Sequence, residues 1–205
     1  VMAAWLHDVG KIAVPEHVMD KSTKLESIYD RINLLKTRFE VIRRDIEINH
    51  MRRGMASSES SRANDDNGSY KETLKSLEED LNFIESVNKG SEFMSDEKIE
   101  RVKKIASRKW KIKGEERPLL TDEEVKNLCV RKGTLTEDEK NVINSHAALT
   151  YEILSQLPFP KKLRNIPHYA SSHHEFINGT GYPKGLKGDE IPLQARILAL
   201  ADIFE

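Results

Sequence analysis

The sequence predicts an all-α protein in which a helical bundle is interrupted by a long helical hairpin. Apolar residues recur at spacings of four and three within residues 28–46, and again within residues 74–84. Thr121 and Thr136 each open a T-x-x-E capping box, which is typical of a helix start. A helical pattern also covers residues 1–12, so the regular elements expected here are all helices.

Composition limits the classes of function that the chain can perform. The 205 residues are 33% charged and 38% apolar, which suggests a compact part joined to a solvated helical part. The net charge of -1 excludes a global attraction to nucleic-acid polymers or anionic membrane surfaces. Cys129 is the single cysteine, so an internal disulfide is excluded and a reducing compartment is favoured.

The location and completeness of the chain are also predicted. No signal peptide and no apolar stretch long enough to span a bilayer is visible. We expect a cytoplasmic protein, or the cytoplasmic part of a longer membrane-anchored sensor. Val1 already lies in a helical pattern and Glu205 stops within one, so we expect the chain to be a fragment of a longer protein.

The first elements in order are a short helix and the hairpin. Residues 1–12 are predicted to be the end of a helix, because Gly10 and Pro15 limit its continuation. The first heptad seam comprises Ile28, Ile32, Leu35, Phe39, Ile42 and Ile46, and the second comprises Leu74, Leu77, Leu81 and Ile84. Residues 52–69 are interpreted as a flexible polar connection. The two seams predict an antiparallel helical hairpin, a structural or homodimerising coiled coil.

The later elements contain most of the histidines that stand out from the apolar pattern. Residues 95–112 are predicted to be a helix, and further helices start after Thr121 and Thr136. The helix after Thr136 ends before Pro158 and turns His146 inward, which taken alone favours a satisfied core histidine. A helix over 166–175 ends at His173-His174-Glu175, a glycine-rich loop follows at 178–185, and a last helix runs over 193–204.

An adjacent His7-Asp8 pair inside an apolar run is the first sign of a site. Buried imidazole and carboxylate groups are costly unless something compensates them. On a helix Lys11 shares a side with both, so we hypothesise that a metal compensates the pair and that Lys11 holds an anionic substrate. Asp202 is a second sign of a site, because a carboxylate on an apolar helix needs a cation.

Six groups form the predicted ligand set: His7, Asp8, His146, His173, His174 and Asp202. Imidazole and carboxylate ligands suit Fe, Mn, Zn, Ni or Co and argue against a thiolate site. The set is too large for one catalytic ion, so we predict two or more ions bridged by Asp8 and a water. Such ions generate a hydroxide nucleophile for phosphoester cleavage, while Lys11 neutralises a phosphoryl oxygen. Asp8 and Lys11 are therefore the candidate catalytic residues.

Two motifs resemble those of a known family. His7-Asp8-Val9-Gly10-Lys11 resembles the signature of the HD phosphohydrolase superfamily, and His173-His174-Glu175 with Gly179-Thr180-Gly181-Tyr182-Pro183 resembles that of its HD-GYP subgroup. The resemblance covers roughly residues 1–24 and 120–205. It implies an HD domain in two parts, 1–24 and 120–205, separated by a helical insertion at 25–119.

The resemblance also implies a function. It implies a metal-dependent phosphodiesterase of bacterial signalling that hydrolyses cyclic di-GMP to pGpG or GMP, with two or three divalent ions, most often iron. The six groups match the family's metal ligands, Lys11 matches its substrate-phosphate lysine, and Gly181, Tyr182 and Pro183 match the loop on the substrate side. Attached sensory domains are implied as partners. The alternatives are an HD hydrolase for another nucleotide and a degenerate sensing or interaction module.

Some residues depart from that pattern or are interpreted without a function. An upstream histidine and downstream basic residues of the family lie outside this chain, and Asn178 replaces the usual aspartate. We therefore predict weak metal loading and little activity for this chain alone. His17 and His50 are interpreted as surface histidines, and His168 as a surface or second-layer group.

Overall fold

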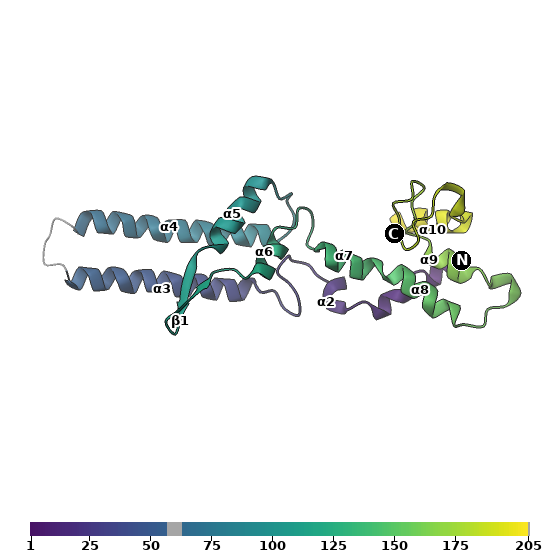
Figure 1. The fold of residues 1–205 in the computed structure, drawn as a ribbon, viewed down its shortest axis with the longest axis horizontal. Coiled ribbons are helices and arrows are strands. Elements are labelled where there is room, and N and C mark those ends of the chain that lie inside the picture. The colour runs from purple at the N-terminus through teal and green to yellow at the C-terminus, as the bar shows by residue number, and fades with distance from the viewer. Residues whose placement is uncertain (57–62, 205) are drawn as a thin grey trace. The chain divides into compact units, whose positions relative to one another are not determined.

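The computed structural model describes residues 1–56 and 63–204, which form two compact units (Figure 1). We call Val1–Asp20 with Glu137–Glu205 the histidine unit, and Lys21–Thr136 the hairpin unit. The predicted all-α class is confirmed, because the only sheet in the described residues is a pair of short strands. The predicted domain boundaries at 24/25 and 119/120 concern the family's domains and stay a prediction.

The hairpin unit is built on α3 (Ile32–Ala56) and α4 (Ala63–Asn88), which run side by side as predicted (Figure 1). The seams supply its core: Leu35 and Ile84 are fully buried, and Phe39 and Leu77 nearly so. Ile28 is wrongly placed in the first seam, because it precedes α3 and is 90% exposed.

The predicted polar connection at 52–69 is wrong at both of its ends. Residues 52–56 and 63–69 continue α3 and α4, while residues 57–62 lie outside the described part of the chain. Polar residues suffice there because a solvated hairpin needs only a narrow apolar seam. His50, predicted to be a surface group, is half-buried and stacks on Tyr70 with ring centroids 4.2 Å apart.

The base of the hairpin unit holds α5 (Asp96–Ala106), strands β1 (Lys109–Ile112) and β2 (Glu115–Pro118), and α6 (Asp122–Leu128). The predicted helix over 95–112 is therefore wrong beyond Ala106. The antiparallel strands are joined by Lys113 and Gly114, both with positive φ, which is the backbone of a tight hairpin turn. The capping box at Thr121 is confirmed in full.

The described part of the histidine unit consists of short helices and the loops between them. The helices are α1 (Met2–Leu6), the 3₁₀ helix η1 (Val9–Ala13), α2 (Glu16–Met19), α7 (Glu137–Asn144), α8 (His146–Ser155), η2 (Lys161–Leu163), α9 (Ile166–Ser171), η3 (Gly188–Glu190) and α10 (Leu193–Ile203). A small core of Leu154, Ile166 and Ala170 joins α8 to α9. The start of the last helix after Pro192 is confirmed.

Three predicted helices of this unit are shorter or broken. The first ends at Leu6 and gives way to η1, so His7 and Asp8 sit at the break. The helix after Thr136 divides into α7 and α8 at Ser145, and α9 ends at Ser171, before the two histidines. Each break frees a histidine from the regular spacing of a continuous helix.

The first segment of the chain packs tightly on α8. The Gly10 amide donates to Thr150 Oγ1 at 3.0 Å, and that hydroxyl donates to the His7 carbonyl oxygen at 2.9 Å. A β-carbon at Gly10 would collide with the His146 carbonyl oxygen and the Thr150 amide. The absence of a side chain at Gly10 therefore allows His7 and Asp8 to approach His146.

Among the described helices, none is both long and apolar enough to cross a membrane.

Candidate metal centre

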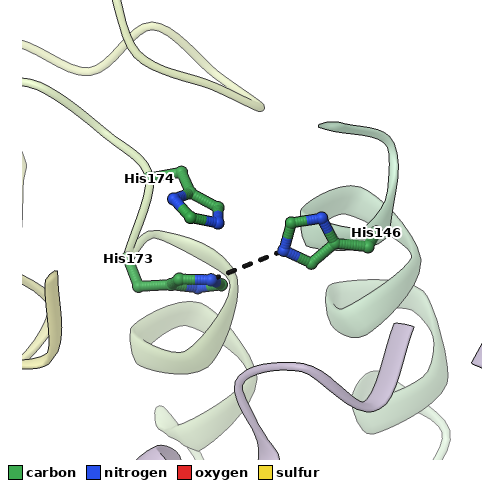
Figure 2. A group of neighbouring side chains, drawn as sticks. All are labelled: His146, His173 and His174. Carbon is green, nitrogen blue, oxygen red and sulfur yellow. Dashed lines mark hydrogen bonds between the residues drawn. The ribbon is translucent and has the colours of Figure 1, made fainter. Parts of the chain in front are cut away.

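Three histidines converge from two segments of the histidine unit (Figure 2). His146 starts α8, and His173 and His174 follow the end of α9. The Nε2 atoms of His146 and His173 are 3.5 Å apart, and the ring centroids of His173 and His174 are 4.0 Å apart. One potential ligand atom of each of the three lies within 4.8 Å of the others, which is the spacing of a metal site.

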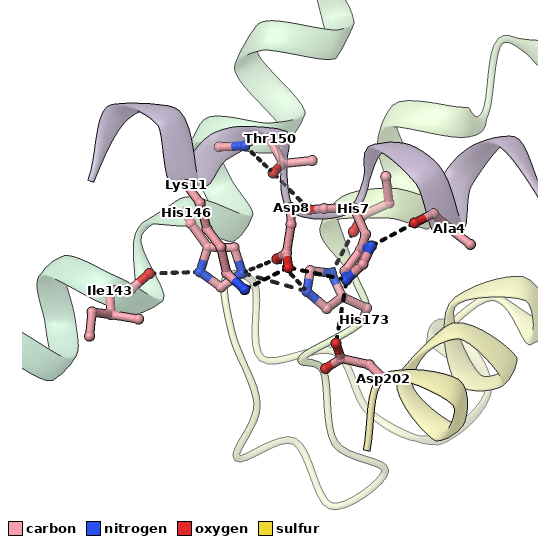
Figure 3. Close-up of polar contacts among 11 residues, drawn as sticks. Ala4, His7, Asp8, Lys11, Ile143, His146, Thr150, His173 and Asp202 are labelled. Carbon is pink, nitrogen blue, oxygen red and sulfur yellow. Dashed lines mark hydrogen bonds and ion pairs between the residues drawn. The ribbon is translucent and has the colours of Figure 1, made fainter. Parts of the chain in front are cut away.

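The adjacent residues His7 and Asp8 lie beside these three histidines (Figure 3). His7, Asp8 and His173 form a second group whose ligand atoms lie within 4.8 Å of one another. Asp8 Oδ1 is 3.4 Å from His146 Nε2, and Asp8 Oδ2 is 3.3 Å from His7 Nε2. The two oxygens of Asp8 thus face different histidines, as the oxygens of a bridging carboxylate do.

Asp202 and Lys11 complete the arrangement. Asp202, on α10, places Oδ1 at 3.3 Å from His7 Nε2 (Figure 3). Lys11 Nζ donates to Asp8 Oδ2 at 2.5 Å, so these two side chains lie together although the helix predicted to carry them ends at Leu6. All six predicted ligands and Lys11 therefore gather in one unit, although Asp8 is only partly buried, with 31% of its side chain exposed.

The backbone fixes the orientation of three of the imidazole rings. Nδ1 of His7, His146 and His173 lies 2.7, 2.6 and 2.6 Å from the carbonyl oxygens of Ala4, Ile143 and Ala170. A carbonyl only accepts, so Nδ1 carries the proton and donates it. Nε2 is then an unprotonated acceptor in each ring, which is the preorganisation that metal-binding histidines show.

Two buried acceptors at the centre lack a donor. His7 Nε2 and Asp8 Oδ1 are buried and have no hydrogen-bond partner among the described residues. Buried polar atoms are nearly always paired, so each such orphan needs an explanation. A cation between these acceptors would satisfy both, and the described residues therefore fit a metal.

Charge and burial favour the ligand forms of these groups. Burial lowers the pKa of His173, and it lowers the pKa of His174 to about 4, with help from the other two histidines. Burial opposes ionisation of Asp8, but the Lys11 hydrogen bond and the charge of His7 outweigh it, so the Asp8 pKa is lowered. At neutral pH the two histidines are neutral and Asp8 is anionic, as metal binding requires.

These pKa shifts predict an acid-sensitive metal-free protein. Between about pH 4 and the ordinary value of 6.5 the unfolded chain binds more protons at His174 than the folded chain does, so stability falls as the pH falls. The lowered Asp8 pKa acts in the same direction only at more acidic pH, as the pH falls below the ordinary value of 3.8. We expect a lower midpoint of thermal unfolding in EDTA at pH 5 than at pH 7.

Two substitutions test the source of that pH dependence. His174→Gln removes a titrating group and should reduce the difference between the two pH values. The exposed His17 is the matched control, and His17→Gln should leave the difference unchanged. An equal pH dependence in His174→Gln and the unchanged protein would contradict this assignment.

The glycine-rich loop closes one side of the centre. The Tyr182 ring lies 4.8 Å from the His174 ring and 6.3 Å from the His146 ring, centroid to centroid. Burial, with the charges of Asp202 and Asp8, raises the pKa of Tyr182 to about 12, so its phenol stays a neutral donor. Gly181 packs against the backbone of residues 174–176, where a β-carbon would not fit, and Pro183 is exposed.

Sequence reasoning missed two supporting residues, Thr150 and Glu175. Thr150 joins η1 to α8, and its only signal in the sequence is a position one turn after His146. In the sequence Glu175 stands out only as part of a motif, yet it is 4% exposed and accepts hydrogen bonds from two backbone amides. His17 is exposed as predicted, and His168 is half-buried, with a pKa lowered by burial and by Lys184.

Comparison with known proteins supports the class that this fold and site define. Residues 122–205 match the family model of the HD domain. Residues 122–205 are therefore similar to HD domains, which are metal-dependent phosphohydrolases, and the relatives support the predicted resemblance to the HD-GYP subgroup. No solved structure matches the chain significantly.

The curated relatives are larger bacterial proteins. The chain is 46% identical over 81 residues to the cyclic di-GMP phosphodiesterase response regulator RpfG of Xanthomonas campestris, a match that covers 38% of this chain and 21% of RpfG. It is 45% identical over 76 residues to 3'3'-cGAMP-specific phosphodiesterase 3 of Vibrio cholerae, covering 37% and 16% of the two chains. A cyclic di-GMP phosphodiesterase of Thermotoga maritima is 37% identical over 78 residues, covering 38% and 21%. The chain thus matches about a fifth of the length of these relatives.

Proposed function

We propose that the histidine unit belongs to a metal-dependent phosphodiesterase that hydrolyses cyclic di-GMP. The single observation that carries the proposal is the pair of buried acceptors, His7 Nε2 and Asp8 Oδ1. They lack a hydrogen-bond partner among the described residues and belong to the cluster formed by the two three-residue ligand groups. The relatives named as cyclic di-GMP phosphodiesterases supply the substrate class.

Two divalent ions suit the arrangement of the ligand atoms. One group of His146, His173 and His174 and another of His7, Asp8 and His173 would each hold an ion, with Asp202 beside His7. Imidazole with carboxylate suits Fe, Mn, Zn, Ni or Co, and the family resemblance favours iron and allows a third ion. The ions would activate a water and neutralise phosphoryl charge when bound.

The chain's own residues would position the substrate. Lys11 is 42% exposed at its side chain and ends beside Asp8, so its ammonium group can contact a non-bridging phosphate oxygen. The neutral Tyr182 phenol borders the histidines and can donate to a substrate oxygen. Asp8 holds the Lys11 side chain in place between turnovers, because the two are hydrogen bonded.

A second candidate substrate is 3'3'-cGAMP. The specific observation in its favour is the 45% identity to the Vibrio cholerae enzyme named for that dinucleotide. Dimerisation through α3 and α4, attached sensory domains and a cytoplasmic location stay predictions of the sequence.

Hydrolysis by metal-loaded protein tests the proposal. We would load the protein anaerobically with Fe(II) or Mn(II), measure the bound metal, and follow cyclic di-GMP and 3'3'-cGAMP by chromatography. Formation of pGpG or GMP is expected, in small yield for this chain alone, in keeping with the weak loading and low activity predicted from its sequence. Cleavage of 3'3'-cGAMP alone would select the second candidate, and a fully loaded protein inert toward both would refute the proposal and favour a sensing module.

Replacing Lys11 should weaken substrate binding and turnover together. Lys11→Met keeps the aliphatic stem but removes the ammonium group, so kcat/KM for the cleaved dinucleotide should fall on the order of 10²-fold. Lys140 is a matched control, because it forms an i,i+3 ion pair with Glu137 on α7. Lys140→Met should retain full activity, and an equal loss in both variants would exclude a local role of Lys11.

A further inference from the structure

The loop that carries Tyr182 is held by one buried carboxylate. Glu175 follows the two histidines directly and is 4% exposed. Its Oε1 accepts the Lys184 amide at 2.7 Å, and its Oε2 accepts the Leu186 amide at 2.8 Å. Charge-assisted hydrogen bonds of this kind are stronger than neutral ones, and a buried carboxylate is costly without them.

The same loop returns to the histidines at a second point. The Tyr182 amide donates to the His174 carbonyl oxygen at 3.1 Å, two residues before the first of the amides that Glu175 binds. Gly181 lies against the backbone of residues 174–176. The position of the Tyr182 ring beside His174 therefore depends on contacts before and after it, and the later contacts go to Glu175.

We propose that Glu175 is a positioning residue that holds the loop of residues 178–186 so that Tyr182 stays at the substrate side of the centre. The statement about substrate rests on the proposed function, whereas the anchoring of the loop does not. Both carboxylate oxygens are in use, so an amide in place of the carboxylate would lose one acceptor and would turn its NH₂ group toward a backbone N–H. Glu175→Gln is thus a nearly isosteric test.

Amide hydrogen exchange tests the anchoring without any substrate. In the unchanged protein the Lys184 and Leu186 amides should exchange at least about tenfold more slowly than the intervening Gly185 amide, because they donate to a buried carboxylate. Comparable exchange at all three would overturn the proposal, whether or not any variant folds. In Glu175→Gln, protection at Lys184 or Leu186 should fall about tenfold.

A comparison of two substrates distinguishes a role of Glu175 in positioning Tyr182 from general damage to the metal centre. With the metal content unchanged, Glu175→Gln should raise KM for the cleaved cyclic dinucleotide about tenfold, with kcat within about threefold, because ground-state positioning is affected. Hydrolysis of bis(4-nitrophenyl) phosphate, which lacks nucleotide groups for Tyr182 to contact, should be retained. Equal losses on both substrates, or loss of metal, would overturn the proposed role.

A second glutamate of the same region is the matched control. Glu190 is exposed and accepts the backbone amide of Lys187 at 2.8 Å. Glu190→Gln should leave the exchange of Lys184 and Leu186 and the KM unchanged, and an effect equal to that of Glu175→Gln would contradict the assignment. If the unchanged protein cleaves no cyclic dinucleotide, the proposed function fails while the exchange experiment still decides the role of Glu175.

Discussion

Replacing Asp8 with asparagine is expected to remove most metal binding and to lower the proposed hydrolysis of a cyclic dinucleotide on the order of 10³-fold. Asparagine keeps the shape of the side chain but loses the negative charge and one acceptor. The amide has only one oxygen, so it could not offer an oxygen ligand to each of two ions. Lys11 would also lose the carboxylate that it binds at 2.5 Å. No other described side chain of the centre places its two oxygens toward both His146 and His7.

The experiment compares metal content with rate. Bound metal is measured by elemental analysis after loading and desalting, and initial rates are measured on the same samples. Asp20, an exposed residue at the end of α2, provides the control, and Asp20→Asn should match the unchanged protein in both measurements. An Asp8→Asn protein that retains its metal and its rate would rule out the bridging role.

The composition of the centre was predictable because its anomalies are local in the sequence. A histidine next to an aspartate within an apolar run, and an aspartate on an apolar helix, each signal an unmet cost of burial. That argument identifies His7, Asp8 and Asp202 without knowledge of the fold. The backbone carbonyls that orient the rings were not predictable, because they depend on helix breaks at His7 and Ser145.

The errors in the fold have a common cause. Propensity and spacing describe one segment at a time, whereas helix ends are decided by tertiary contacts. The polar stretch beyond Arg52 remains helical because α3 and α4 support each other, as in the stacking of His50 on Tyr70. Conversely, the charged residues 109–112 resemble a solvated helix, but the turn at Lys113 and Gly114 pairs them with 115–118.

Replacing Gly10 with alanine is expected to destabilise the histidine unit and to disturb the metal centre from outside it. The new β-carbon would meet backbone atoms, the His146 carbonyl oxygen and the Thr150 amide, which cannot rotate away as a side chain can. Overpacking costs about 1–3 kcal/mol, and a clash with backbone belongs at the upper end. The midpoint of thermal unfolding by calorimetry should then fall by about 6–10 °C.

A glycine-to-alanine substitution in α3 should instead stabilise the protein. Gly54 lies in α3. Apart from its chain neighbours and the adjacent backbone of the same helix, no described atom comes within 4 Å of the position that a β-carbon would take there. Gly54→Ala should therefore stabilise the helix by about 0.5–1 kcal/mol through helix propensity alone.

The amount of bound metal should also differ between the two variants. Gly10→Ala should lower the bound metal, because a shift of η1 moves His7 and Asp8 away from His146, whereas Gly54→Ala should leave it unchanged. A Gly10→Ala protein with unchanged stability and full metal would show that η1 and α8 can separate without cost. The centre would then not depend on the close packing that places its two ligand groups together.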